Sequence, residues 1–302
     1  MARFIPFIFV MLWSTGFIGA RFGLPYAEPA TFLFIRMALN ILIFIVLLYL
    51  LNGQLPTGRA RLHSMVAGVL IHGFYLGGTY YGIYLGMPAG LCALLVGLQP
   101  VLTAVLLVAM GQERLALSQW LGLVVGLMGI TLVLQGNMSW QQEDHQVAAY
   151  LCAAIALLGI TLGTLYQKRF CQQVDLVGGS VYQYLMAALL FAPVMMTMET
   201  MQVEWNLTFT LTLAWLVLGV SVTAVWLLLY MVRHGEASKV ASTFYLVPPV
   251  TALEAWLAFN ETFDAMSAVG FMLAAMAVYL VMRKPKAAQP QEKALTSVQQ
   301  ES

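Results

Sequence analysis

Residues 89–134 read AGLCALLVGLQPVLTAVLLVAMGQERLALSQWLGLVVGLMGITLVL, and this stretch decides the fold. It contains two uncharged apolar segments, each close to the roughly 20 residues that a helix needs to cross hydrocarbon. A polar elbow joins them at residues 111–114. The pattern returns 148 residues later, with Pro100 matched by Pro248, Thr103 by Thr251, Ala104 by Ala252, Glu113 by Glu261 and Gly122 by Gly270. A repeat at a fixed offset predicts two copies of one structural unit.

The composition predicts a protein that lies in lipid. Of the 302 residues, 61% are hydrophobic and only 9% are charged, whereas soluble domains carry about 25% charged residues. The net charge of +1, without a basic stripe, argues against a nucleic-acid partner. The three cysteines (Cys92, Cys152 and Cys171) have neither metal-ligand spacing nor a disulfide pattern, and we interpret them as small packing residues.

Apolar segments of spanning length recur along the whole chain and predict an all-α polytopic membrane protein with ten transmembrane helices. The predicted spans are 4–20, 30–51, 63–85, 89–110, 117–136, 147–167, 178–198, 208–231, 238–259 and 265–282. Residues 1–140 form the first five-helix unit and residues 141–284 the second. The polar, Pro/Gln-rich residues 285–302 are expected to be a disordered cytoplasmic tail.

The distribution of Lys and Arg predicts the orientation in the membrane. Twelve basic residues lie at the ends and loops of one side, and the opposite loops hold only Arg21. Both termini are therefore expected in the cytoplasm. Because each unit has an odd number of spans, the second unit enters from the opposite side. Inverted repeats of this kind are typical of secondary transporters, whose substrate site lies between the repeats near the bilayer midplane.

The two copies of the elbow also resemble a known family. GLQPVLTAVLLVAMGQERLALSQWLGLVVGLMGITLVL (residues 97–134) and YLVPPVTALEAWLAFNETFDAMSAVGFMLAAMAVYLV (residues 245–281) are similar to the two halves of an EamA-type member of the drug/metabolite transporter superfamily. The opening WSTGFIGARFG (residues 13–23) is similar to that family's first helix. The resemblance implies a ten-helix transporter of the inner (plasma) membrane that exports metabolites, amino acids or drugs.

Two other function classes are weighed against a transporter. An intramembrane enzyme needs a catalytic set, and the chain has no H-E-x-x-H, no paired intramembrane aspartates and no G-x-S-x-G. A non-transporting scaffold or receptor of the same fold would be favoured by an added soluble domain, which the short joints do not provide. No G-x-x-x-x-G-K-[ST] is present, so neither ATP nor another cofactor is expected.

Arg36 and Glu254 are the most costly residues inside the predicted spans. Ionisable residues at membrane depth usually face a cavity or a partner. Arg36 is a candidate anchor for an anionic substrate group, and Glu254 is a candidate proton carrier. Alternatively the two form a structural ion pair, which we slightly favour because both are expected in the external half of the membrane. Glu254 replaces Leu106 of the first copy, so the two halves are not equivalent.

The remaining candidate substrate contacts are polar or aromatic residues near mid-span. Trp13 and Ser14 lie in the first span, and either helix packing or substrate contact would explain them. His72 is expected to make an interhelical hydrogen bond or to contact substrate. A metal site is not expected, because no second ligand-type residue has a suitable spacing from His72. Among the tyrosines of span three, Tyr80 or its neighbour Tyr81 could face the cavity.

Prolines within two spans predict bent helices that line the cavity. Proline frees a backbone carbonyl one turn earlier and bends a helix. Pro100 is preceded by Gln99, and the adjacent Pro248 and Pro249 follow Tyr245 by one turn. The elbow carboxylates Glu113 and Glu261 are instead expected to be structural, each placed before the positive N-terminal end of the helix that follows it.

The expected partners follow from this interpretation. They are a small-molecule substrate, the lipid bilayer and, as a candidate coupling ion, the proton. The sequence leaves open whether the protein is a monomer or a homodimer, and it leaves the substrate and the direction of transport open as well.

Overall fold

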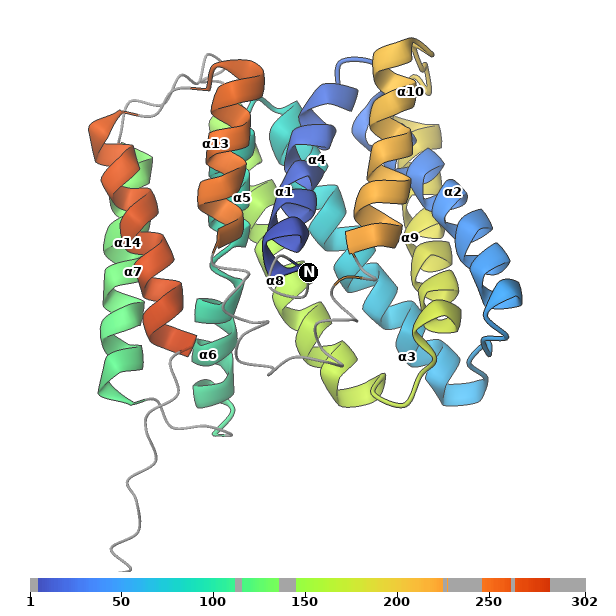
Figure 1. Ribbon diagram of the computed structural model, residues 1–302, viewed down its shortest axis with the longest axis horizontal. Helices are drawn as coiled ribbons and strands as arrows, with labels where there is room; N and C mark the ends of the chain where they lie inside the picture. The colour runs from blue at the N-terminus through green and yellow to red at the C-terminus, as the bar shows by residue number, and fades with distance from the viewer. Residues whose placement is uncertain are drawn as a thin grey trace, which may run out of the picture.

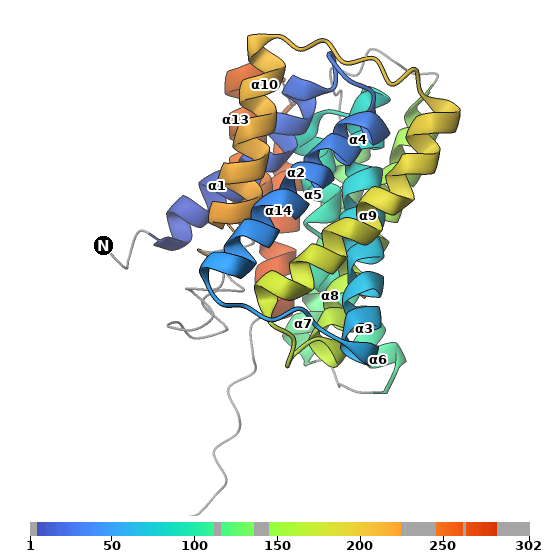
Figure 2. The same ribbon diagram turned by 90° about the vertical axis from the view of Figure 1, so that its right-hand side faces the viewer.

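The computed structural model describes residues 5–111, 116–135, 145–224, 227, 246–261 and 264–282. The described residues form a bundle of helices (Figures 1 and 2). Its α-helices are α1 (Ile5–Gly23), α2 (Pro29–Leu50), α3 (Gly58–Gly68), α4 (Leu76–Tyr84), α5 (Ala89–Val96), α6 (Gln99–Ala109), α7 (Leu117–Gln135), α8 (Gln146–Phe170), α9 (Leu176–Met198), α10 (Leu207–Ala214), α13 (Val247–Phe259) and α14 (Ala265–Met282). Two π-helical segments, η2 (Val69–Tyr75) and η4 (Trp215–Ala224), continue α3 into α4 and extend α10.

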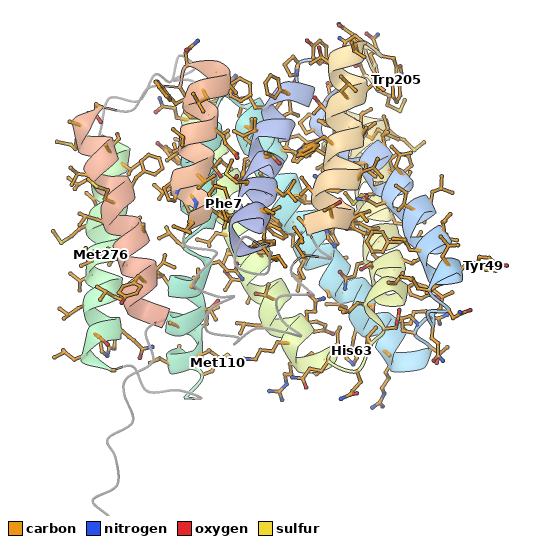
Figure 3. The ribbon with its side chains drawn as sticks, viewed as in Figure 1. Phe7, Tyr49, His63, Met110, Trp205 and Met276 are labelled. Carbon is orange, nitrogen blue, oxygen red and sulfur yellow. The ribbon has the colours of Figure 1, made fainter. Side chains whose placement is uncertain are left out.

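These helices suit a bilayer. In the described part of the chain, five are long and apolar enough to cross a membrane: Pro29–Leu50, Ala89–Ala109, Gln146–Phe170, Leu176–Met198 and Leu207–Ala224. Four further apolar helices are shorter. The outer surface is also apolar, and Met276 and Tyr49 lie exposed at opposite edges of the molecule (Figure 3). Water does not solvate such a surface well, whereas lipid does.

Two half-helices, one in each copy of the repeated stretch, begin at the prolines. The span from Ala89 to Ala109 is broken at Gly97 and Leu98, and α6 begins beside Pro100. In the second copy α13 begins at Val247, with Pro248 and Pro249 in its first turn. Proline is well tolerated there because the first N–H groups of a helix have no intrahelical partner. From these starts α6 and α13 extend toward opposite ends of the bundle (Figure 1).

Small residues allow helices α7 and α14 to pack closely at one edge of the bundle (Figure 1). Gly129 and Gly270 meet across this pair. A Cβ at Gly270 would lie 2.6 Å from the Gly129 carbonyl oxygen, and one at Gly129 would lie 2.8 Å from the Gly270 carbonyl oxygen. The glycine-rich stretch after the first elbow is therefore a helix-packing face.

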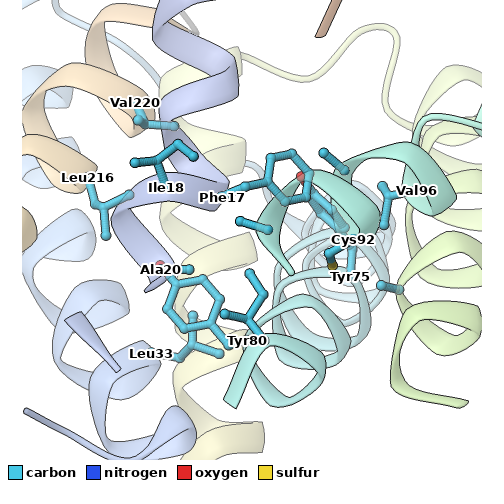
Figure 4. Packing of buried hydrophobic residues seen from close by; sticks show 14 of the residues in the cluster. Phe17, Ile18, Ala20, Leu33, Tyr75, Tyr80, Cys92, Val96, Leu216 and Val220 are labelled. Carbon is cyan, nitrogen blue, oxygen red and sulfur yellow. The ribbon is translucent and has the colours of Figure 1, made fainter. Parts of the chain in front are cut away.

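The hydrophobic core lies where α1 packs against helices of both repeats. Buried side chains from α1 (Phe17), α2 (Leu33), α5 (Cys92) and η4 (Leu216) pack into one cluster (Figure 4). Tyr80, from α4, is also buried in this cluster. The cluster adjoins a small cavity lined by aromatic, aliphatic and a few polar side chains, which the next section describes.

Candidate functional site: a cavity around Arg36

A cavity of about 80 Å³ lies among helices of both repeats. Helices α1, α2, α4, α8 and α9 and both π-helical segments contribute to its wall. The lining residues that bear on function are Trp13, Arg36, His72, Tyr75, Thr79, Tyr80, Tyr184 and Ser221. Four of these (Trp13, Arg36, His72 and Tyr80) are among the substrate contacts predicted from the sequence. The volume holds a few waters or one small polar group.

Among the described residues that line this cavity, Arg36 is the one that carries a fixed positive charge. Its side chain is 4% exposed. Nη1 donates to the Tyr80 hydroxyl at 2.9 Å, and Nη2 lies 3.4 Å from the Leu216 carbonyl oxygen and 3.3 Å from the Ser221 hydroxyl. Nε is buried and has no hydrogen-bond partner in the part of the chain that the structure describes. All three acceptors are neutral, so among the described residues the positive charge of Arg36 is solvated by dipoles.

The predicted ion pair between Arg36 and Glu254 does not form. Among the described residues, the one carboxylate within 4.0 Å of an Arg or Lys is Glu261, which contacts Arg21. Arg36 is instead oriented by Tyr80 on α4 and by η4. Within this π-helical segment the Ser221 hydroxyl also donates to the Leu216 carbonyl at 3.1 Å. Irregular helical turns of this kind are frequent at functional sites.

His72 lies in the other π-helical segment and packs between aromatic and amide groups. Its ring is 4.4 Å from the ring of Tyr184 on α9, and the side chain of Gln183 lies beside it. No group of three metal-ligating side chains occurs among the residues that the structure describes. The imidazole therefore contributes a polar edge to an otherwise aromatic wall.

The tyrosines of span three separate into two groups. Tyr75 and Tyr80 line the cavity, and Tyr80 also packs edge-on against Phe32 with ring centroids 5.3 Å apart. Tyr81 faces away, because its hydroxyl donates to Glu199 Oε1 at 2.6 Å. Of the two alternatives left open by the sequence, Tyr80 is the one that faces the cavity.

The bent half-helices meet one another beside this cavity but do not line it. A Cβ at Gly97, in the break of the first repeat, would lie 2.6 Å from Cγ of Pro248, so the two breaks are in close contact. Gln99 Nε2 donates to the Thr164 hydroxyl at 2.9 Å on α8. The cavity lining includes neither Gln99, Pro100, Pro248 nor Pro249. Tyr245 lies outside the described residues.

Ser14 and Glu254 form a separate polar contact between α1 and α13. The Ser14 hydroxyl lies beside the Glu254 carboxyl but donates to the Met11 carbonyl at 3.0 Å. Both carboxylate oxygens of Glu254 are buried, and neither has a hydrogen-bond partner among the described residues. Neither residue lines the cavity around Arg36.

Glu261 is structural, as expected, but it caps a different helix. Its carboxylate accepts from the backbone N–H groups of Ala89 at 3.1 Å and Gly90 at 3.4 Å, and Arg21 Nε lies 3.4 Å from Oε1. These N–H groups open α5, in the first repeat, where the helix dipole favours a negative charge. The expectation that Glu261 serves the helix following it was therefore wrong. Glu113 lies outside the described residues.

Several lining residues escaped the sequence analysis. Tyr184 and Ser221 lie in long apolar stretches of the second repeat, and nothing local distinguishes them from packing residues. Asn40 supports the site from one turn beyond Arg36 and donates to the Ser221 hydroxyl at 3.1 Å. Its spacing of four residues from Arg36 was the one available indication, because such residues share a helix face.

The chain is similar, along most of its length, to proteins that are named as transporters or as an efflux pump. The transporter YvbV of Bacillus subtilis is 25% identical over 281 residues, covering 92% of this chain and 90% of that protein. The inner membrane transporter YedA of Escherichia coli is 22% identical, covering 91% and 88%. A Salmonella typhimurium protein named "Probable amino-acid metabolite efflux pump" is 21% identical, covering 92% and 93%.

A solved crystal structure has the same fold, with a TM-score of 0.65 at 19% identity, and the match covers 99% of this chain and 98% of that one. The EamA-like transporter family matches residues 3–135 and again residues 147–283. Its members, and the relatives named above, are transporters and not enzymes. The two family matches, covering most of the sequence, show that this chain is a membrane protein belonging to the EamA-like transporter family.

Proposed function

We propose that the protein is a secondary transporter of the inner (plasma) membrane that exports small amino-acid-like metabolites. In this proposal both termini are cytoplasmic, and the two inverted five-helix repeats move against each other to give alternating access. Arg36 binds the carboxylate of the substrate. The observation that carries the proposal is the buried guanidinium of Arg36, which faces a cavity and whose hydrogen-bond partners among the described residues are all neutral.

The charge of Arg36 favours an anionic group in the cavity. A buried arginine without a counter-ion is costly, and such residues in membrane proteins mark substrate or ion pathways. The planar guanidinium suits a carboxylate, which it can bind through two parallel hydrogen bonds. The unpartnered Nε supplies one further donor. A substrate carboxylate would therefore complete a site that the described residues leave without an anion.

The other walls favour a small, partly apolar molecule. Trp13, Tyr75 and Tyr184 present aromatic surface around the cavity, while His72 adds one polar edge. Aromatic side chains offer large apolar contact area and can also face an ammonium group. The relative named as an amino-acid metabolite efflux pump agrees with this chemistry. Because the cavity encloses about 80 Å³, the helices around it must separate to admit an amino acid.

Counterflow into proteoliposomes tests the proposal. Vesicles containing purified protein are preloaded with unlabelled L-phenylalanine, L-leucine or L-threonine and diluted into the labelled compound, with tetraphenylphosphonium as the cationic drug of the panel. We expect labelled amino acid to accumulate transiently with the wild type. Phenylethylamine, which lacks the carboxylate of phenylalanine, should compete at least tenfold more weakly.

The variants Arg36→Lys and Arg36→Gln distinguish the contribution of the positive charge from that of the planar guanidinium group. Lysine keeps the charge without the planar fork, so we expect reduced counterflow with Arg36→Lys and none with Arg36→Gln. Equal transport by wild type and Arg36→Gln would contradict the role of Arg36. A folded wild-type protein that moves no compound of the panel would favour the alternative, a non-transporting scaffold or receptor of the same fold.

A further inference from the structure

A second polar site lies on a different face of α1 from the cavity. Trp13 lines the cavity, whereas the next residue, Ser14, faces Glu254 on α13. Both oxygens of the Glu254 carboxyl are buried and lack a hydrogen-bond partner among the described residues. A buried carboxylate without donors is costly in a low-dielectric environment, and such a group takes up a proton instead of remaining charged.

The helices packed against α13 supply no cation to this carboxyl. In the described part of the chain, α1 carries one charged residue, Arg21, which lies two turns beyond Ser14 and contacts Glu261. The titratable residue of α5 is Cys92, which is buried, and that of α14 is Tyr279, which is largely exposed. Arg36 is engaged with Tyr80 and η4. The described residues thus supply no cation to Glu254, and a proton can neutralise its carboxylate in place of one.

The position of Glu254 suits a group that changes its surroundings during transport. It lies two turns into α13, the half-helix whose start contacts the break of the first repeat at Gly97. The matching position of the first copy is Leu106, so this acidic group occurs in one half of the molecule. Any movement of α13 relative to α1 alters the contact with Ser14, and any movement of α1 also displaces Trp13 in the cavity wall.

We propose that Glu254 is a proton-binding site that couples proton entry to substrate export through α1. One proton binds the carboxylate to give the neutral acid when the site is open to the outside. The same proton leaves when the site is open to the cytoplasm, and one substrate molecule moves outward per cycle. The coupling rests on the proposed transport function, whereas the binding of the proton by Glu254 does not.

Carbodiimide labelling tests proton binding without any substrate. Dicyclohexylcarbodiimide partitions into apolar regions and reacts with protonated carboxyl groups. We expect mass spectrometry of the reconstituted full-length protein to find the adduct on Glu254 at pH 7, with less adduct at pH 9. The exposed Glu204 should stay unlabelled, and the Glu204→Gln variant should label as the wild type does. Absence of the adduct on Glu254 at both pH values, with the protein folded, would overturn the proposal.

A pH gradient tests the coupling. Proteoliposomes with equal potassium on both sides and valinomycin, which clamps the membrane potential, are given a one-unit pH gradient and labelled L-phenylalanine. One proton per substrate supports at most about a tenfold concentration ratio, since one pH unit corresponds to a factor of ten. We expect a gradient-dependent ratio with the wild type and with Glu204→Gln, and a ratio near one with Glu254→Gln.

The possible failures can be told apart. If Glu254→Gln responds to the gradient as the wild type does, the coupling role of Glu254 is wrong even where the carboxyl is labelled. If the wild type moves no L-phenylalanine even in counterflow, the proposed substrate class fails, and the labelling result alone then decides whether Glu254 binds a proton.

Discussion

The carboxylate of Glu261 accepts a hydrogen bond from the backbone nitrogen of Ala89 at 3.1 Å, although the two residues are 172 positions apart and belong to different repeats. This contact, with the neighbouring bonds to Gly90 and Arg21, ties the end of α13 to the first turn of α5. An elbow of one repeat thus caps a span of the other.

Glu261→Ala should destabilise the protein more than Glu261→Gln. Alanine leaves the buried N–H groups of Ala89 and Gly90 without an acceptor, a loss of about 1–3 kcal/mol, whereas the glutamine carbonyl can still accept one bond. We expect Glu261→Ala to lower the midpoint of thermal unfolding in detergent by several degrees, as followed by tryptophan fluorescence. Glu204→Gln, at an exposed carboxylate, should leave it unchanged. Equal midpoints for all three variants would show that the cap contributes nothing.

Arg36 and Glu254 should behave as independent residues. Because Arg36 is bound by Tyr80 and η4, removing Glu254 releases no partner of the guanidinium. In a double-mutant cycle with Arg36→Gln and Glu254→Gln, we expect the effects on thermal stability to add within about 0.5 kcal/mol. Recovery of stability in the double variant relative to Arg36→Gln would instead reveal an ion pair.

Two glycines of α4 provide a matched pair for testing the packing against α8. A Cβ at Gly78 would clash with the backbone carbonyl of Cys152, whereas one at Gly82 finds its nearest atom, the Ala149 carbonyl oxygen, at 3.5 Å. Alanine otherwise favours a helix over glycine by about 0.5–1 kcal/mol. Gly78→Ala should therefore reduce the yield of monodisperse protein in size-exclusion chromatography. Gly82→Ala should match or exceed the wild type, and a reversed order would contradict this packing.

The bond from Gln99 to Thr164 should respond asymmetrically to substitution. Thr164→Val leaves the partly buried amide of Gln99 without its acceptor, at a cost of about 1 kcal/mol or more. In Gln99→Met the Thr164 hydroxyl keeps its bond to the Ile160 carbonyl at 2.8 Å, so the loss should be smaller. Thermal unfolding of the two single variants and the double variant measures both costs. A double variant that loses the sum of both would argue against a shared bond.

The sequence predicted apolar helices in the parts of the chain that the structure describes, because each of them carries its own apolar run. The break beside Pro100 was also predictable, since proline cannot donate the hydrogen bond that an uninterrupted helix requires. Arg36, His72, Tyr80 and Trp13 stood out as polar or amphipathic residues in apolar surroundings, and the structure brings all four to one cavity.

The contacts between repeats could not be predicted from local pattern. Which helix Glu261 caps depends on which N-terminus the folded chain brings to it, and the partner is in the other repeat. Tyr184 and Ser221 reach the cavity because α9 and η4 pack around Arg36, not because of their neighbours in the sequence. The pairing of Arg36 with Glu254 failed for the same reason: similar depth in the membrane does not place two side chains on facing helices.

The π-helical segment Val69–Tyr75 helps to determine which side of span three faces Arg36. A π turn is equivalent to one residue inserted into an α-helix, and an α-helix rotates by about 100° per residue. If the same residues wound as a regular α-helix, Thr79 and Tyr80 would be turned by about 100° relative to Arg36. The hydrophobicity of the span would not change, yet the cavity would lose one of its walls. The winding of this span is therefore as much a part of the site as the side chains it carries.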